Sequence, residues 1–222
     1  SGTTAKDKSG QGNAGTLENM DNADWVAGKV GSNALDFDGS NDYISIASPS
    51  SFNFGTGDFA FTTWINTTDT NTGANNYPGL LTESSTEGFY LDAGKIAAWL
   101  GGSWPADFIT SNNTVNNGAW RHIVVTRTNG TIYMYIDGVE DKNAALSETL
   151  DLSSSTRIAD QASNKELDGM LDEMRLYNRF LSASEITNLY NSQKKAFPTV
   201  SKPTLSDGLV GYWNFDTGVG GS

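Results

Sequence analysis

The 222-residue sequence predicts an all-β protein, an antiparallel sandwich with one short helix near its C-terminal end. Three observations predict this class. Short segments rich in β-branched and aromatic residues recur along the chain, turn residues separate them at close intervals, and a clear helix-start signal occurs only near residue 182. Aromatic residues make up 11% of the chain, which is enough to fill a large core.

Charge and composition exclude several classes of protein. The formal net charge is −12, and an acidic surface repels phosphate backbones, so we expect no nucleic-acid partner. The absence of cysteine excludes disulfides, thiolate-bound zinc and thiol catalysis. No apolar run approaches the ~20 residues of a membrane span.

The strands follow from alternation and turn chemistry. After a largely polar start, with a short strand around Leu17, the expected strands are 25–26, 34–38, 43–46, 59–66, 79–82, 89–91, 96–100, 120–128, 131–138, 157–159 and 169–177. Asn129 and Gly130 predict a tight hairpin turn, and Gly94 predicts another. Residues 69–76 and 111–117 are expected to be polar loops.

The C-terminal region contains a helix, a linker and one more strand. Ser182 and Glu185 form a capping box that predicts a helix ending near Asn191. Its apolar face is expected to contain Ile186, Leu189 and Tyr190. Residues 192–207 contain Lys, Pro and Ser and predict an extended linker. The last segment, 208–222, predicts a buried strand with the large side chains Leu209, Tyr212, Trp213 and Phe215.

Four segments resemble a known family in the right order. Residues 34–44 resemble the "LxFDGxxDYV" segment of bacterial laminin-G-like domains, and 120–126 resemble their "WHHVAVT" strand. Residues 132–138 resemble "xxYVDGV", and 170–182 resemble "IDEVRIYNRALS". The resemblance covers roughly residues 15–191 and implies the concanavalin A-like jelly roll, an antiparallel sandwich.

The chain departs from this family at its start. Residues 1–16 resemble the second half of the stretch that opens such domains, and residues 209–216 resemble its first half. We therefore expect residues 1–191 to form a laminin-G-like jelly roll that lacks its opening strand. The segment 208–222 would complete its own domain, complete a neighbouring subunit, or begin a next repeat.

Asp172 is the main candidate for a metal ligand. Strict alternation along 169–177 places it on one face with Met170, Met174 and Leu176. A buried carboxylate needs a cation or hydrogen bonds, and loop amides are the alternative to a metal. The resemblance implies a structural Ca²⁺ at this aspartate, with an acidic residue after the opening strand, which corresponds to Asp216. Other oxygen ligands would come from Asn13, Asp7 or Asp42.

Ligand-binding and catalytic candidates are few. Trp99, Trp104 and Tyr77 lie in or near expected loops, where aromatic rings either stack on sugars or pack on the core. Glu166 and Asp168 match part of a glucanase pattern whose third acid is replaced by Leu171, so hydrolysis is disfavoured. His122, the only histidine, is expected to be structural.

These observations predict a non-catalytic, extracellular or cell-surface module of a large surface or appendage protein. Its C-terminal strand would complete a jelly roll in the same chain or in a neighbouring copy, as in a filament. The alternative is a carbohydrate-binding module of a secreted polysaccharide-degrading enzyme, and a glycoside hydrolase is the weaker third hypothesis. The expected partners are copies of the chain or a glycan.

Overall fold

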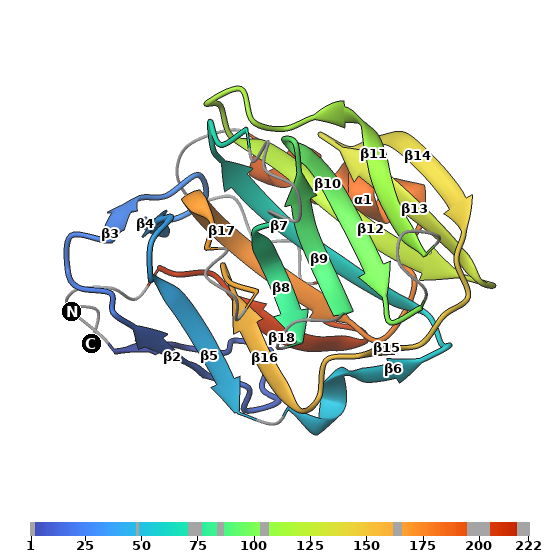
Figure 1. The fold of residues 1–222 in the computed structure, drawn as a ribbon, viewed down its shortest axis with the longest axis horizontal. Coiled ribbons are helices and arrows are strands. Elements are labelled where there is room, and N and C mark those ends of the chain that lie inside the picture. The colour runs from blue at the N-terminus through green and yellow to red at the C-terminus, as the bar shows by residue number, and fades with distance from the viewer. Residues whose placement is uncertain are drawn as a thin grey trace.

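The structure is a computed structural model that describes residues 3–47, 49–70, 77–83, 87–102, 107–161, 166–194 and 205–216. Two large antiparallel sheets pack face to face, and one helix lies outside them (Figure 1). The predicted all-β sandwich with a single short helix is therefore confirmed. Trp104 and most of the expected linker lie outside the described residues. The described helical segment lacks the length and apolar character of a membrane span.

The first sheet has the strand order β1-β2-β5-β16-β8-β9-β10-β11. Its strands, in that order, are Thr4–Ala5, Gly15–Glu18, Tyr43–Ala47, Ser155–Ile158, Gly79–Glu83, Glu87–Asp92, Lys95–Leu100 and Phe108–Thr114. A separate pair, β6 (Asn53–Gly55) and β15 (Leu150–Asp151), follows a short 3-10 turn at Ser50–Phe52.

The second sheet has the order β14-β13-β12-β7-β17-β4-β3, and β18 pairs with β17 beside it. These strands are Val139–Ala145, Thr131–Ile136, Arg121–Thr128, Phe59–Asn66, Asp168–Tyr177, Asn33–Asp38 and Trp25–Ala27, and β18 is Leu209–Trp213. Two strands pair with successive parts of one edge of β17. β4 pairs with residues 168–171 and β18 with residues 174–177.

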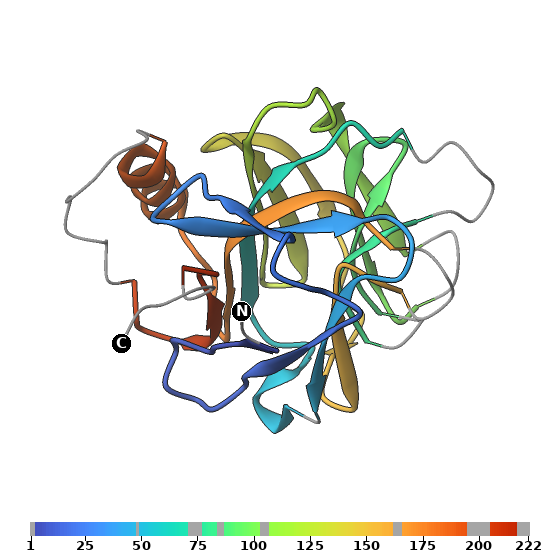
Figure 2. The same ribbon diagram turned by 90° about the vertical axis from the view of Figure 1, so that its left-hand side faces the viewer.

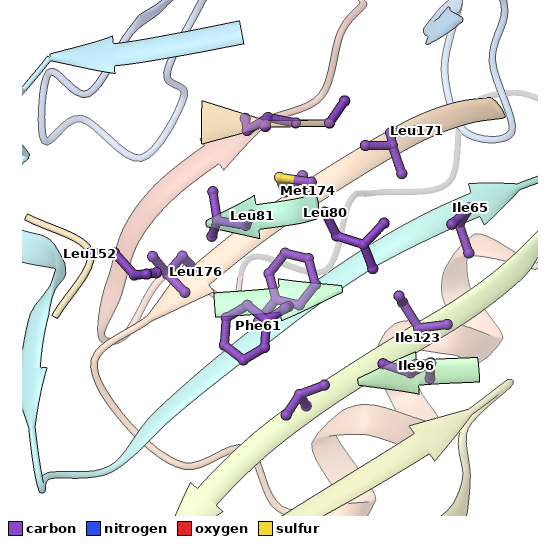
Figure 3. Packing of buried hydrophobic residues seen from close by; sticks show 14 of the residues in the cluster. Phe61, Ile65, Leu80, Leu81, Ile96, Ile123, Leu152, Leu171, Met174 and Leu176 are labelled. Atoms are coloured by element: carbon purple, nitrogen blue, oxygen red, sulfur yellow. The ribbon is translucent and has the colours of Figure 1, made fainter. Parts of the chain in front are cut away.

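A large cluster of buried apolar side chains fills the space between the two sheets, and Figure 3 shows part of it. The rings of Phe61 and Phe89 stack across the interface with centroids 4.6 Å apart. Ile65, Ile123 and Met174 of the second sheet are also fully buried. Each such side chain contributes about 1.5–3 kcal/mol of transfer free energy. Alternation along the strands therefore accounts for the sandwich.

The predicted turns and helix cap are present. Asn129 and Gly130 have φ of 49° and 69°, as a type I′ turn requires. Ser182 caps helix α1 (Ala183–Gln193) in a full capping box, and the helix ends two residues later than expected. Figure 2 shows α1 standing against the outer face of the second sheet, on the side away from the first.

The short strands β1, β6 and β15 were not predicted, nor were the longer edge strands β11 and β14. Residues 111–114, expected to be loop, belong to β11, and β14 continues the hairpin of β13. Both strands are polar and largely exposed on at least one face, so they lack the apolar alternation that signals a strand. The Asp141 carboxylate accepts hydrogen bonds from the Asn112 and Asn113 amides, at 2.5 and 3.2 Å, and joins the two sheet edges.

The predicted face of Asp172 is wrong because β17 contains a β-bulge. Its register against β7 shifts between Asp172 and Arg175, and Glu173 has a φ of 52°. Leu171 and Met174 consequently both enter the core. Asp172 and Glu173 both lie on the outer face of the second sheet, where Asp172 is the cross-strand partner of Trp64.

Candidate functional site

Three partly exposed aromatic side chains gather near the β11 edge of the first sheet. Trp99 of β10 is the cross-strand partner of Phe108 of β11, so both rings lie on the same face of the sheet. The Phe108 ring contacts that of Tyr77, with centroids 5.1 Å apart and planes tilted by 54°. The neighbours of Trp99, Ala98 and Leu100, enter the core, so this face is the outer one. We call Tyr77, Trp99 and Phe108 the aromatic group.

Polar groups surround the aromatic group. The Trp99 indole donates to the carbonyl of Gly102 at 3.3 Å, which orients the ring. Burial, and secondly the charge of Asp92, raise the pKa of the Tyr77 hydroxyl. Tyr90, on the same face of β9, is buried, and its hydroxyl has no hydrogen-bond partner. Rings with nearby carboxylate and amide groups can stack on a sugar ring and bond its hydroxyls.

Sequence reasoning found two members of the aromatic group and missed the third. Tyr77 and Trp99 were predicted as ligand-binding residues, and the structure brings them together through Phe108. Phe108 was missed because β11 itself was not predicted. The predicted partner Trp104 lies outside the described residues.

The carboxylates of Asp172 and Asp216 both accept hydrogen bonds from the loop between β3 and β4. The Val30 amide donates to Asp172 Oδ2 at 2.8 Å, and the Ser32 amide donates to Asp216 Oδ1 at 2.7 Å. Asp172 is fully buried, and its second oxygen, Oδ1, has no hydrogen-bond partner. Burial, together with the charges of Glu173 and Asp216, raises the pKa of Asp172 to about 8 against the Val30 hydrogen bond.

The unpartnered oxygen of Asp172 is the feature of this region that fits a bound cation. An unpartnered, buried carboxylate oxygen beside a second carboxylate is costly, and a cation would remove that cost. Calcium prefers six to eight oxygen ligands, which carboxylates and backbone carbonyls supply. Among the described residues there is no group of three or more His, Asp or Glu that could hold a metal ion.

Asn13 and Asp42 have other partners. The Asn13 side chain donates to the Val210 carbonyl at 2.7 Å and therefore holds β18. Asp42 accepts from the Asp38 amide at 3.3 Å, and burial and the Asp38 charge raise its pKa to about 6. Of the four predicted metal ligands, Asp172 and Asp216 thus bond the same loop. Asn13 and Asp42 make other hydrogen bonds.

The C-terminal strand lies in a slot of its own chain. Beside β17, Trp213 is fully buried, and its indole donates to the Asn13 carbonyl at 3.0 Å. The Lys8 amide donates to the Tyr212 carbonyl at 2.7 Å, so the N-terminal loop covers the outer edge of β18. Of the other predicted strand residues, Phe215 is buried in the core, and Leu209 packs against a smaller apolar cluster below α1.

Two of the catalytic candidates, His122 and Asp168, make contacts within the fold. His122 is buried on the outer face of the second sheet, where its ring lies 5.2 Å from that of Trp64. Burial, with a smaller effect of the Arg175 charge, lowers its pKa to about 3, so the imidazole is neutral. Asp168 begins β17, where its carbonyl accepts from Thr67 Oγ1. The expectation that His122 is structural agrees with this environment.

The geometry defines a β-sandwich of the type found in lectin-like binding domains. A family model described as the concanavalin A-like lectin/glucanases superfamily, of the laminin-G type, matches residues 38–187. The chain belongs to this superfamily. No curated protein matches the chain.

Solved structures share the fold at low sequence identity. The binding domain of Paraclostridial Mosquitocidal Protein 1 is 20% identical with a TM-score of 0.62, covering 80% of this chain and 47% of its own. Domain 4 of an extracellular arabinanase from Geobacillus stearothermophilus, in complex with arabinotriose, is 16% identical with a TM-score of 0.55, covering 78% and 81%. The binding domain of Botulinum Neurotoxin DC, in complex with SialylT, is 10% identical with a TM-score of 0.64, covering 86% and 52%. The chain therefore spans about half of the toxin domains that it resembles.

Proposed function

We propose that the chain is a non-catalytic, extracellular glycan-binding module whose ligand lies on the aromatic group. The observation that carries this proposal is the contact between Tyr77 and Phe108 beside Trp99, on the outer face of a rigid sheet. Half-buried rings that are fixed by a sheet lose little entropy on binding, so they suit stacking on a sugar. The arabinanase domain and the toxin domain support the proposal, because they were solved with arabinotriose and with SialylT.

The test is binding of the intact chain to a glycan array, followed by calorimetry with the best oligosaccharide. Trp99→Ala should weaken binding at least about tenfold, a loss of ~1.4 kcal/mol. The matched control is Tyr133→Ala, because Tyr133 is a partly exposed aromatic residue of the second sheet. Equal affinity of Trp99→Ala and the unsubstituted chain would exclude the aromatic group as the binding site.

A non-catalytic module should also release no sugar from the glycan that it binds. Glu166→Gln and Asp168→Asn test this expectation, because these are the acids that matched part of the glucanase pattern. If the unsubstituted chain releases sugar and either variant does not, the proposed function would be glycan hydrolysis and not binding alone.

As part of this function we propose a structural Ca²⁺ held by Asp172 and Asp216. The unpartnered Oδ1 of Asp172 supports it, and the ion would tie the end of β18 to the loop between β3 and β4. A chelator should lower the melting temperature of the intact chain, and added Ca²⁺ should restore it. In Asp172→Asn the chelator should change nothing. An unchanged melting temperature of the unsubstituted chain would remove calcium from the proposal.

The second candidate function is assembly through β18, as in a filament of a surface or appendage protein. The observation that favours it is that β18 is held as an added strand, by β17 on one edge and by the N-terminal loop on the other. The same contacts form when β18 comes from a neighbouring copy, so exchange would cost little at equilibrium.

Light scattering over a concentration series tests assembly. Assembly predicts growth of the intact chain with concentration, and a synthetic peptide of residues 205–222 should block that growth by filling the slot. A chain that stays monomeric throughout, with unchanged glycan binding, would exclude assembly and leave the first proposal intact.

A further inference from the structure

Within the described part of the chain, four buried polar groups beneath helix α1 lack hydrogen-bond partners. They are Thr62 Oγ1, His122 Nδ1, Arg175 Nη1 and the Tyr177 hydroxyl. Each residue is 4% exposed or less. A buried polar atom without a partner costs about 1–3 kcal/mol, so four of them in one region need a physical explanation.

These groups lie on one face around Arg175. Thr62 of β7 is the cross-strand partner of Arg175, and Tyr177 is two residues further along the same face of β17. His122 of β12 is the cross-strand partner of Trp64, which lies two residues from Thr62 on the same face of β7. The unpartnered atoms therefore come from three adjacent strands, β12, β7 and β17.

Charge balance excludes an ion at this place. Arg175 forms a buried ion pair with Glu173, so its charge is already compensated. His122 is neutral, and the group contains no further carboxylate that could attract a cation. A small neutral molecule that both donates and accepts hydrogen bonds suits these groups better than an ion.

We propose that the region enclosed by Thr62, His122, Arg175 and Tyr177 is a binding site for ordered water beneath α1. A water molecule there accepts from Arg175 Nη1 and donates to the Thr62 oxygen or to the His122 nitrogen. Internal waters typically make two to four such bonds, and no larger ligand can enter past side chains this buried. The site lies where the sheet meets β18, since Tyr212 is the cross-strand partner of Arg175.

A high-resolution crystal structure of the intact chain tests this directly. The proposal expects an ordered water within hydrogen-bond distance of Arg175 Nη1 and of at least one of the other three atoms. Side chains in van der Waals contact with each other, without water density between them, would overturn it.

Thr62→Val provides a second measurement. If water binds the hydroxyl, the substitution removes a hydrogen bond and should raise the unfolding equilibrium constant about fivefold. If the region is dry, valine removes an unsatisfied group, and the constant should stay unchanged or fall. Thr63→Val is the matched control, because its buried hydroxyl already bonds the Asp172 carbonyl at 3.0 Å and its loss should cost about fivefold in either case.

Discussion

Asp172 and Glu173 are consecutive residues of β17, yet both side chains lie on the outer face of the second sheet. The positive φ of Glu173 makes this arrangement, and residues other than glycine adopt such a φ only at a cost of about 1–3 kcal/mol. The gain is a set of buried contacts. Glu173 pairs with Arg175 and accepts hydrogen bonds from Gln193 at 2.8 Å and from the Tyr212 hydroxyl at 2.9 Å. One bulged residue thus connects the sheet, the helix and the C-terminal strand.

His122 predicts a pH dependence of stability. Its pKa is about 3 when folded and about 6.5 when unfolded, so the unfolded chain binds the extra proton between these values. The His122 contribution to stability is therefore complete above pH 6.5 and is lost as the pH falls toward 3, by up to about 1.4 kcal/mol per pH unit.

Urea denaturation between pH 4 and 7 checks this prediction. Asp42 and Asp172 act in the opposite direction, because their raised pKa values make stability fall as the pH rises above about 4. The comparison must therefore be made against His122→Phe, which keeps an aromatic ring beside Trp64 and removes the titrating group. Parallel pH profiles for the two proteins would contradict the buried, neutral state of His122.

The C-terminal strand contributes both backbone pairing and core volume. Without β18, residues 174–177 of β17 would present an unpaired edge, and Trp213 would leave a gap beside Phe52, whose ring lies 6.1 Å away. The strand therefore completes the sandwich of its own chain in this structure.

Trp213→Ala should lower the free energy of unfolding by about 3–5 kcal/mol, because the fully buried indole is replaced by a cavity. Denaturant unfolding measures the loss. Trp99→Ala is the control, since its ring is partly exposed and its removal should cost clearly less. Similar losses of unfolding free energy for the two variants would contradict the burial of Trp213 in the core.

Elements with apolar alternation or a specific turn signal could be predicted from the sequence. The hairpin at Asn129–Gly130, the cap at Ser182 and most inner strands are present where they were expected. The edge strands β11 and β14 could not be predicted, because exposed strands need no apolar face. The bulge at Glu173 could not be predicted either. The residues on both sides of it still alternate, and only the register against β7 shifts by one residue.

The aromatic group and the Asp172–Asp216 region could be predicted only in part, because they depend on how distant segments pack. Trp99 and Tyr77 are recognisable as aromatic residues near loops, but their contact through Phe108 depends on the register of β10 and β11. The approach of Asp216 to Asp172 depends on where a strand distant in sequence docks. Such contacts follow from tertiary packing, which local patterns do not encode.

The complete molecule is an acidic sandwich with its helix on the outer face of the second sheet (Figure 2). The register of β10 and β11 places the aromatic group on the outer face of the first sheet. The helix covers the outer face of the second sheet and buries polar side chains there, such as Trp64 bonded to Gln193 at 3.0 Å. The outer face of the first sheet carries no helix in the described part of the chain. The two faces therefore differ in what covers them, and the proposed glycan site lies on the face of the first sheet.

An NMR titration of the isotopically labelled chain with the best-binding oligosaccharide tests the central claim most directly. The account predicts that the largest amide shift changes fall on β9, β10 and β11 around Trp99 and Phe108, and that they saturate together. Saturable shift changes confined to the outer face of the second sheet, around α1 and β14, would contradict it.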